Sequence, residues 1–421
     1  MPISALHIEN FKGIADPERI PIRPITLFIG PNSSGKSSCI HGLAALAQTV
    51  KLSAPTRALV LDDQYAQVHL GRFIEVIHSR TYKDAIRLGV EIPGVRIMTL
   101  RAKNAAAAPP VTVAADYAFK STRRTQELYL ENALMTAGTR SIEVKRTKEG
   151  HYRTIDSAHA QEFKARRANG FLCTISFDSA SRFKEEFLGT WSSLEAIQLE
   201  VAKSLSKTLY MGPFRQPPQR PYPTMGAAPS EVGAMGEHAV AMLANEYIQS
   251  HSRPHLEQVS SWLNRLGVSK KIELQRVGRS DQFYVNMTLR DGSSLPIADL
   301  GYGVSQVLPV LVQCSIAPAG STLLFEQPEL HLHHGAAKKL GRVFQEAVNA
   351  KDIHIVAETH SKELFHQVFE EIRGGRLSTD QVAAYEVRRQ GGKSVFVPIG
   401  IELEDGHLEV SHPWGSGLDA N

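Results

Sequence analysis

Two short segments carry side chains whose types and spacing suit phosphate chemistry. The first is GPNSSGKS at residues 30–37, which matches the glycine-rich pattern of a phosphate-binding loop and lies between an expected strand and an expected helix. Backbone N–H groups of such a loop cradle phosphates, while Lys36 would reach the outer phosphates and Ser37 would ligate Mg²⁺. The residues predicted to bind nucleotide here are Gly30, Pro31, Asn32, Ser33, Ser34, Gly35, Lys36, Ser37 and Ser38.

The second segment is TLLFEQPELHLH, in which an apolar strand ends at Glu326 and is followed three residues later by Glu329. Two carboxylates at a strand end suit two roles. Glu326 would hold the ligand shell of Mg²⁺, and Glu329 would orient and polarise an attacking water. The alternative, two exposed loop acids, is disfavoured because a buried strand precedes them in a chain that also has a phosphate-binding loop.

Two further stretches add candidate phosphate contacts. The expected strand IHIVAETHS ends in His360, which would donate a hydrogen bond to the terminal phosphate or the attacking water. The alternative is that Ser361 caps a helix and His360 is incidental. In DLGYGVSQVLPVLVQ, Gly303 and Ser305 open an apolar helix whose backbone donors make a second phosphate site. Because one chain already has its own phosphate loop, this second site would serve nucleotide held by another copy, which predicts a dimer.

The elements that must position these residues alternate between strand and helix. Strands are expected at residues 3–9, 25–29, 321–326 and 352–359, and helices at residues 37–50, 304–317 and 335–348. This pattern predicts an α/β fold with a mixed or parallel sheet and flanking helices. Residues 111–205 mix strand-like and helix-like patterns without a catalytic signature, which indicates an inserted α+β lobe. The predicted parts are residues 1–100, 101–205, 206–400 and 401–421.

Three other groups of residues allow two interpretations. The proline-rich stretch YMGPFRQPPQRPYPTMG is expected to be a loop, in which Arg215 and Arg220 are either phosphate-directed or engaged in ordinary packing. The basic run at residues 164–167, with Arg182 and Lys184, is interpreted as a solvated helix face rather than a DNA site. A zinc cluster is disfavoured for His331, His333 and His334, because they follow the two acids directly.

Composition indicates a folded protein that is not exported. The chain has 421 residues, of which 42% are hydrophobic and 21% charged, so we expect one large α/β domain with an insertion, or two domains. The three cysteines are far apart, which argues against a disulfide framework and favours a reducing, cytoplasmic location. No signal peptide or membrane span is expected. The net charge of +4 is compatible with nucleic-acid contact without indicating it.

The motifs resemble those of the ABC-type ATPases grouped with the RecF-like, SMC-like and OLD proteins. IENFKGI, GPNSSGKS, VHLGRF, YMGPFR, LGYGVSQVLP, EQPELHLH and ETHS occur in the order that these stand-alone prokaryotic ATPases use. The resemblance implies ATP and Mg²⁺ as cofactors and an ABC-type head fold. It implies Walker A roles for Lys36 and Ser37 and a switch role for His360. Glu326 and Glu329 would be the Walker B acid and the catalytic base, and Gly303 with Ser305 the signature used in trans. Gln67, chosen over Gln64, would be the Q-loop ligand of the metal.

The resemblance also implies a nucleotide-gated head-to-tail homodimer, or a higher homo-oligomer, in anti-phage defence or DNA maintenance, with DNA as a candidate partner. Only residues 361–421 follow His360, which is too short for the TOPRIM nuclease domain of some relatives, so we expect a separately encoded effector. The alternative is a slow-turnover nucleotide-sensing scaffold, against which Glu329 argues. A transporter subunit is disfavoured by the nonstandard signature and the insertion, and a GTPase by the lack of an NKxD motif.

Overall fold

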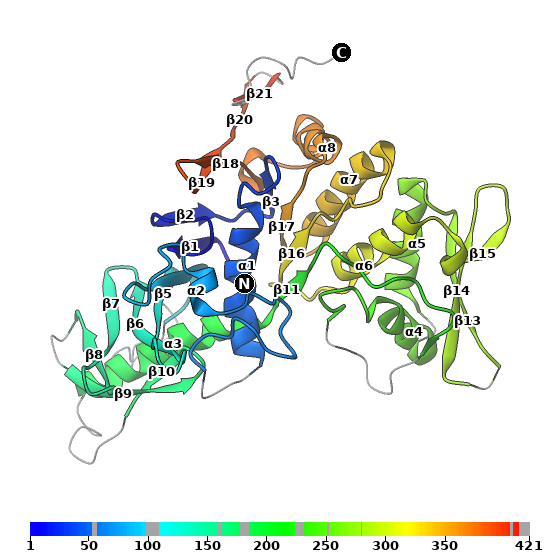
Figure 1. The fold of residues 1–421 in the computed structure, drawn as a ribbon. Coiled ribbons are helices and arrows are strands. Elements are labelled where there is room, and N and C mark those ends of the chain that lie inside the picture. The colour runs from blue at the N-terminus through cyan, green and yellow to red at the C-terminus, as the bar shows by residue number, and fades with distance from the viewer. Residues whose placement is uncertain are drawn as a thin grey trace. The chain divides into compact units, whose positions relative to one another are not determined.

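The computed structural model describes residues 1–52, 57–97, 109–158, 162–176, 185–223, 229, 231–250, 252–278, 280–404 and 407–411. Figure 1 labels the elements. The chain forms two compact units, and each is described by itself. Unit 1 comprises residues 1–22, 33–208 and 389–395, and unit 2 comprises residues 23–32, 209–388 and 396–421.

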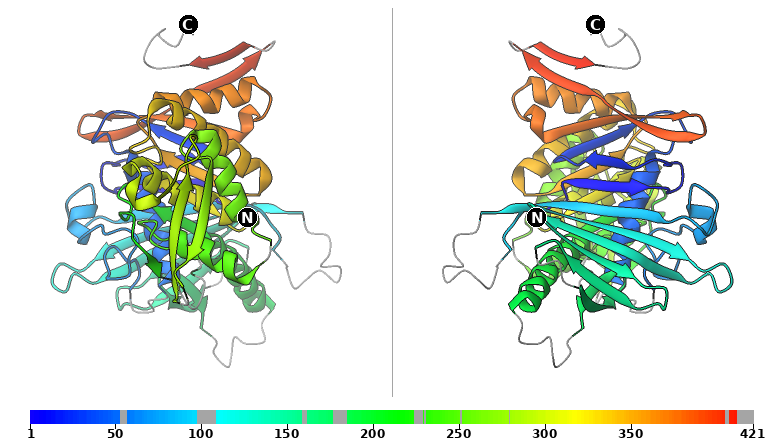
Figure 2. Two further views of the ribbon diagram at one scale, coloured as in Figure 1. Left: turned by 90° about the vertical axis from the view of Figure 1, so that its right-hand side faces the viewer. Right: turned by 90° about the vertical axis from the view of Figure 1, so that its left-hand side faces the viewer.

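Unit 1 is built on one antiparallel sheet of nine strands in the order β10-β9-β8-β7-β6-β5-β4-β1-β2. The right-hand view of Figure 2 shows these strands side by side. The strands are β1 (Ala5–Glu9), β2 (Glu18–Pro21), β4 (Ile86–Val95), β5 (Val111–Ser121), β6 (Leu128–Ala137), β7 (Arg140–Arg146), β8 (Tyr152–Asp156), β9 (Glu162–Asn169) and β10 (Leu172–Ile175). The helices are α1 (Lys36–Lys51), α2 (Phe73–Val76) and α3 (Glu185–Ser206).

The side chains of these strands alternate between buried and solvent-facing positions, as expected for an antiparallel sheet with one covered face. Helices α1 and α3 pack against the sheet. Gly42 of α1 lies so close to Ile8 and Leu88 that a larger residue there would press on both side chains. On β5, the Tyr117 ring lies 4.4 Å from that of Phe171, centroid to centroid. The sheet and its helices therefore share one apolar core in unit 1.

Unit 2 is centred on a six-stranded sheet in the order β11-β16-β17-β3-β18-β19, beside a smaller antiparallel sheet of β12, β13, β14 and β15 and the hairpin β20–β21. The strands are β3 (Ile25–Ile29), β11 (Thr208–Met211), β12 (Tyr222–Pro223), β13 (Lys271–Arg276), β14 (Gln282–Thr288), β15 (Ser294–Pro296), β16 (Thr322–Glu326), β17 (His354–Glu358), β18 (Val382–Gln390), β19 (Lys393–Pro398), β20 (Gly400–Glu404) and β21 (His407–Ser411). The helices are α4 (Ala239–Gln249), α5 (Pro254–Leu266), α6 (Tyr302–Ile316), α7 (His334–Ala350) and α8 (Lys362–Arg373).

The central strands of unit 2 run parallel, β16 with β17, β17 with β3 and β3 with β18. All five residues of β3 and of β16 are buried, which explains their continuous apolar sequences. Phe325 of β16 stacks on Phe344 of α7 at 5.9 Å between ring centroids, so α7 covers one face. Because parallel strands end at the same edge of the sheet, Glu326 and Glu358 lie next to each other in register.

The structure confirms the predicted α/β class with a mixed sheet, flanking helices and an antiparallel lobe. The strands of the lobe extend a sheet that already contains β1, β2 and β4, and the part boundaries drawn from the sequence stay predictions.

One interpretation is wrong: residues 164–167 belong to β9, not to a helix, and Lys164 and Arg166 are exposed while Ala165 is buried. Arg182 and Lys184 lie outside the described residues, as do residues 412–421 of the predicted tail. In the described part of the chain, no helix is both long and apolar enough to cross a membrane.

Candidate functional site

The phosphate-binding loop connects the end of β3 to the start of α1. Its backbone takes left-handed conformations at Gly30 (φ 147°), Ser33 (φ 61°) and Gly35 (φ 103°), which curl the chain. Helix α1 then begins at Lys36 without an acidic residue in its first turn, so no side chain there offsets the positive end of the helix dipole. Such a curled loop before a helix N-terminus is suited to bind phosphate through N–H groups.

The loop has an exposed part, Pro31, Asn32 and Ser33, followed by a part with enclosed side chains. Lys36 is buried with 3% of its surface exposed, and Ser34 and Ser38 are buried as well. The Ser34 hydroxyl oxygen is buried without a hydrogen-bond partner in the described structure. An enclosed hydroxyl of this kind fits a loop that closes around a polar ligand. The residues Gly30–Asn32 are counted with unit 2 and Ser33–Ser38 with unit 1.

In unit 2, the strand β16 delivers Glu326 at its end. The Tyr210 hydroxyl of β11 donates a 2.7 Å hydrogen bond to Glu326 Oε1. Burial, and then the neighbouring Glu326 carboxylate, raise the Tyr210 pKa well above its ordinary value, so that the phenol stays protonated and remains a donor. Tyr210 thus fixes the orientation of the predicted Walker B acid, a role the sequence did not indicate.

Glu329 follows in a turn that begins with left-handed Gln327 (φ 47°), whose N–H donates to the Glu358 carbonyl at 2.9 Å. Glu329 Oε1 accepts hydrogen bonds from the Thr359 hydroxyl at 2.7 Å and from the His360 N–H at 2.9 Å. Glu329 Oε2 is buried and has no hydrogen-bond partner in the described structure. One carboxylate oxygen is therefore held in place, and the other is available to a ligand.

Arg215 stabilises the same turn through hydrogen bonds to its backbone. Its guanidinium donates to the Gln327 carbonyl at 2.9 Å and to the Glu326 carbonyl at 3.0 Å, and only 2% of the residue is exposed. Burial lowers the Arg215 pKa to about 10, which leaves it positively charged at neutral pH. Arg220 instead pairs with Asp299 in a partly exposed position. Of the two arginines that the sequence left open, Arg215 is the one that contacts the turn.

The histidines near this turn have separate surroundings. His360 is exposed, and Ser361 caps α8 by accepting from the Leu364 N–H at 3.1 Å, so the cap and the exposed histidine coexist. His331 packs edge-on against Tyr302, with 5.1 Å between ring centroids. His333 caps α7, and His334 pairs with Glu363 at 2.9 Å.

Helix α6 begins at Tyr302, so Gly303 and Ser305 lie in its first turn. The Ser305 hydroxyl donates to the Tyr302 carbonyl at 2.7 Å and the residue is buried, so the hydroxyl is engaged within its own helix in this structure. A Cβ on Gly303 would collide with the His331 carbonyl. The start of α6 therefore packs closely against the chain that follows Glu329.

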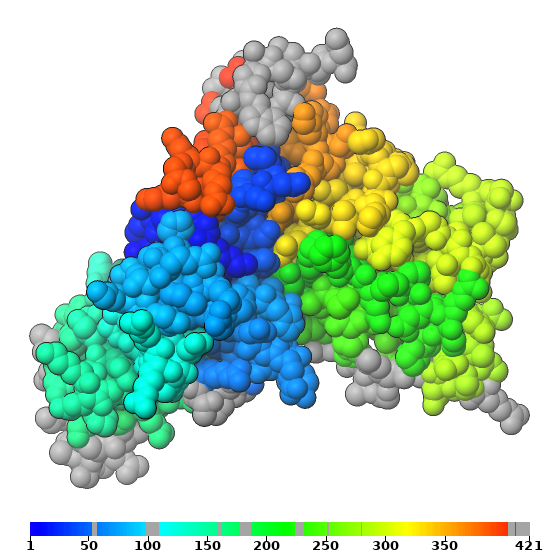
Figure 3. All heavy atoms as spheres, viewed as in Figure 1, coloured from blue at the N-terminus to red at the C-terminus, as the bar shows by residue number. Residues whose placement is uncertain are grey.

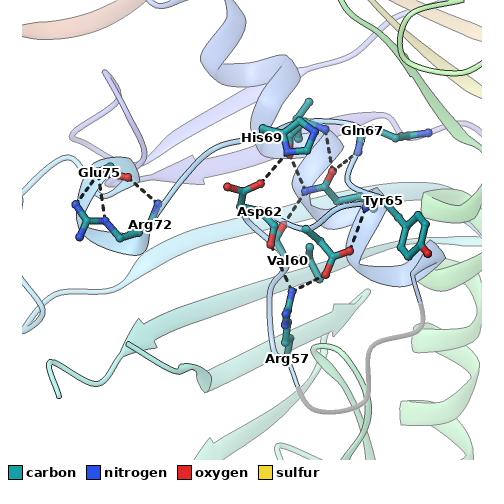
Figure 4. A network of polar contacts seen from close by, with 11 residues as sticks. Arg57, Val60, Asp62, Tyr65, Gln67, His69, Arg72 and Glu75 are labelled. Atoms are coloured by element: carbon teal, nitrogen blue, oxygen red, sulfur yellow. Dashed lines mark hydrogen bonds and ion pairs between the residues drawn. The ribbon is translucent and has the colours of Figure 1, made fainter. Parts of the chain in front are cut away.

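Gln67 lies in a loop of unit 1 that a buried glutamine of α1 holds (Figure 4). Gln48 Oε1 accepts from the Gln67 N–H at 3.0 Å, while Gln48 Nε2 donates to the Val60 carbonyl at 2.8 Å. Gln67 Oε1 is buried without a hydrogen-bond partner in the described structure, whereas Gln64 is exposed. This difference in burial favours Gln67 over Gln64 as a ligand. The segment around residues 57–80, which contains both glutamines, lies on the face shown in Figure 3.

The structure thus brings the predicted residues together in two groups. In unit 2, Glu326, Glu329 and His360 share the edge of the six-stranded sheet. In unit 1, Lys36 and Ser37 open the helix that also positions Gln67. Sequence reasoning missed Tyr210 and Thr359, and the only available signal was their place in the motifs YMGPFR and ETHS.

Two family models match adjoining parts of the chain. Residues 1–172 match a family model described as AAA ATPase domain. Residues 174–365 match one described as AAA domain, putative AbiEii toxin, type IV TA system. Both descriptions name an AAA domain, so these two parts of the chain are similar to AAA-type domains. No curated protein sequence matches the chain.

Solved structures similar to the chain include heads of SMC proteins. The SMC head domain from Thermotoga maritima is 11% identical with a TM-score of 0.41, over 95% of this chain and 100% of that one. An SMC head bound to the C-winged helix domain of ScpA is 13% identical with a TM-score of 0.45, over 94% and 97%. An SMC head with an extended coiled coil, bound to the C-terminal domain of ScpA derived from Pyrococcus furiosus, is 11% identical with a TM-score of 0.42, over 94% and 96%.

Proposed function

We propose that this chain binds ATP with Mg²⁺ and hydrolyses it. The N–H groups of residues 30–38 and the Lys36 ammonium bind the phosphates. Ser37, Glu326 and Gln67 hold the ligand shell of the metal. Glu329 orients the attacking water and accepts its proton, and His360 contacts the terminal phosphate. Bound Mg²⁺ supplies positive charge that neutralises the phosphate oxygens.

The observation that carries this proposal is the difference in hydrogen bonding between the two oxygens of the Glu329 carboxylate. Hydrogen bonds from Thr359 and the His360 N–H fix Oε1, while Oε2 is buried and unsatisfied. A buried polar atom without a partner is rare in folded proteins, because the lost hydrogen bond costs about 1–3 kcal/mol. A water molecule bound to Oε2 would satisfy it and would be held by a fixed base.

The residues also fit the nucleotide and metal on their own chemistry. Among the predicted site residues of the described structure, three buried oxygens lack a hydrogen-bond partner, namely Ser34 Oγ, Gln67 Oε1 and Glu329 Oε2. Oxygens of these types can bind Mg²⁺ directly, or they can form hydrogen bonds with the water ligands of Mg²⁺ and with water bound to phosphate. Left-handed Ser33 and Gly35 provide the curled backbone that an anion needs.

We further propose that ATP joins two copies head to tail, in a homodimer or a higher homo-oligomer. The first turn of α6, with Gly303 and Ser305, would meet nucleotide on the partner copy, for which the Ser305 hydroxyl would turn away from Tyr302. The description of the matching family model, a putative AbiEii toxin of a type IV toxin–antitoxin system, supports a role in prokaryotic defence. A separately encoded effector would read the nucleotide-driven motion, and DNA is a candidate partner.

The second candidate is a scaffold that binds ATP to assemble a complex and turns it over very slowly. The enclosed Lys36 and the curled loop serve binding alone equally well. The two functions differ in the role of Glu329, which a scaffold does not need.

Phosphate release by the purified protein, with ATP and Mg²⁺, separates these functions. We expect Glu329→Gln to lower turnover at least about 100-fold, because a general base contributes this much or more. Glu257→Gln, an exposed residue in the first turn of α5, is the matched control and should turn over like the wild type. Binding without turnover in the wild type would favour the scaffold, and equal turnover in wild type and Glu329→Gln would reject Glu329 as the base.

A further inference from the structure

The motif IENFKGI near the N-terminus forms a tight turn that the proposed chemistry does not use. Asn10 (φ 55°) and Lys12 (φ 51°) adopt left-handed conformations, and Phe11 and Ile14 exchange backbone hydrogen bonds of 2.8 and 2.9 Å. The turn also contacts a residue that is far away in the sequence, because the Gly13 carbonyl accepts a 2.7 Å hydrogen bond from the Ser394 N–H.

Ser394, the second residue of β19, also reaches the phosphate-binding loop. Its hydroxyl donates a 2.7 Å hydrogen bond to the Ser34 carbonyl, and only 5% of the residue is exposed. Gly13, Ser34 and Ser394 all lie within unit 1, because the first three residues of β19 belong to unit 1 and the rest of the strand to unit 2. One buried side chain therefore connects the N-terminal turn to the loop that starts α1.

The glycines on both sides of the Ser394 hydroxyl are needed for this contact. A Cβ at Gly13 or at Gly35 would collide with Ser394 Oγ. Gly35 additionally has a positive φ of 103°, which disfavours any side chain. At Gly13 a side chain is excluded by the lack of space alone. Three segments of the chain, around residues 13, 34 and 394, thus meet around a single hydroxyl.

This contact sets the direction of a peptide group in the phosphate loop. In a trans peptide the C=O and the following N–H point in opposite directions. Because the Ser34 carbonyl points toward Ser394, the Gly35 N–H is aimed toward the opposite side of the loop. Phosphate-binding loops use such N–H groups as ligands, so fixing the carbonyl prepares the N–H before nucleotide arrives.

We propose that Ser394 is a positioning residue for the phosphate-binding loop, held by the Gly13 turn, and that it preorganises the loop for nucleotide. The inference rests on the nucleotide binding proposed above. It gives the IENFKGI motif a role as a support for the phosphate loop. It also makes the start of β19, which lies 360 residues beyond Ser34, part of the binding apparatus.

The test is the affinity for ADP with Mg²⁺, measured by isothermal titration calorimetry on the full chain. ADP reports on the loop without hydrolysis. We expect Ser394→Ala to weaken binding about fivefold to tenfold, as for the loss of one orienting hydrogen bond. Ser321→Ala is the matched control, because Ser321 is also buried and donates to a backbone carbonyl, that of Pro318, at 2.6 Å. It should lose comparable thermal stability and bind ADP like the wild type.

Gly13→Ala supplies a second, independent test. In the wild-type background the new methyl group would push the Ser394 hydroxyl away from Ser34 and weaken binding by a similar factor. In the Ser394→Ala background the nearest remaining side-chain atom is the Cβ of residue 394, at 3.4 Å, so the same change should have little further effect. The double variant should therefore bind ADP like Ser394→Ala alone.

The outcomes separate the inference from the proposed function. Failure of the wild type to bind ADP would reject nucleotide binding itself. Wild-type affinity in Ser394→Ala, or additive losses in the double variant, would overturn the positioning role while leaving the proposed function intact. Should Ser394→Ala not fold, Gly13→Ala alone decides: wild-type affinity in that variant overturns the inference.

Discussion

At the level of single residues, the proposed hydrolysis depends on how firmly Glu329 is held. The Thr359 hydroxyl is one of its two hydrogen-bond donors and is completely buried. We expect Thr359→Val, which keeps the shape and removes the hydroxyl, to lower ATP turnover about tenfold with unchanged ADP affinity. Thr154→Val, at a buried hydroxyl of β8 without a partner in the described structure, is the control. A parallel loss of affinity in Thr359→Val would mean that Thr359 acts on binding instead.

Arg215 carries a second prediction at this scale. Arg215→Met removes the guanidinium donors to the Glu326 and Gln327 carbonyls, at a cost of about 2 kcal/mol in the free energy of unfolding. We expect turnover to fall more than about tenfold because the turn loses its support. Arg220→Met, in the same loop, should change neither quantity appreciably, since its partner Asp299 is partly exposed. Equal effects of the two variants would show that the loop, not Arg215, matters.

The sequence predicts some of these residues and not others, for a physical reason. Lys36 and Glu326 belong to local patterns whose spacing carries the chemistry. Tyr210 and Arg215 act across 116 and 111 residues of sequence, on partners fixed only by the packing of β11 beside β16. Ser394 is a similar case, because nothing in its neighbourhood in the sequence indicates a contact with Ser34.

At the level of elements, the polar face of the large sheet contains a charged cluster that crosses four strands, β5, β4, β1 and β2. His7 of β1 contacts Asp116 of β5 at 2.6 Å and Glu91 of β4 at 2.8 Å, and Arg19 pairs with Glu91 at 2.7 Å. Gly89 of β4 lies between His7 and Asp116 in register, and a Cβ there would collide with Asp116. The absence of a side chain at Gly89 lets His7 reach across β4.

This cluster predicts a pH dependence of stability. Burial alone would lower the His7 pKa, but hydrogen bonds and charge interactions with Asp116 and Glu91 outweigh it, so the His7 pKa is raised. A raised pKa in the folded state stabilises the fold below the unfolded value of about 6.5, and this contribution is lost as pH rises through the folded value. We expect thermal unfolding scans between about pH 5.5 and pH 8 to show this loss in the wild type and not in His7→Gln.

The control for this prediction is His69→Gln, because the pair of His69 with Asp62 is solvent-exposed. It should keep the wild-type dependence on pH. An unchanged slope in His7→Gln would contradict the account of the cluster.

Elements buried on both faces were the easiest to predict. The runs ITLFI and TLLFE are continuously apolar because β3 and β16 are central parallel strands. The segment FKARRA was misread as helical because its charges dominate, although Phe163, Ala165 and the exposed Lys164 and Arg166 follow the period of two of a strand. Charge density thus concealed a pattern that the apolar residues carried.

At the level of the whole molecule, the account predicts that ATP controls the number of copies in the assembly. Glu329→Gln with ATP and Mg²⁺ should have twice the mass of the nucleotide-free protein by light scattering, because hydrolysis can no longer separate the copies. The wild type should show this mass only transiently. Gly303→Val, which would collide with the His331 carbonyl at the start of α6, should prevent the change in mass. A constant mass in Glu329→Gln with and without ATP would contradict the dimer and leave hydrolysis to be judged separately.

The most direct test of the central claim is a single-turnover measurement with protein in excess over radiolabelled ATP in the presence of Mg²⁺. After mixing, the protein-bound nucleotide is separated and its ATP and ADP are quantified. The account predicts that the wild type holds ADP and that Glu329→Gln binds as much nucleotide but holds it as uncleaved ATP. Cleavage at the same rate in both proteins would contradict the assignment of Glu329 as the catalytic base on which the proposed function rests.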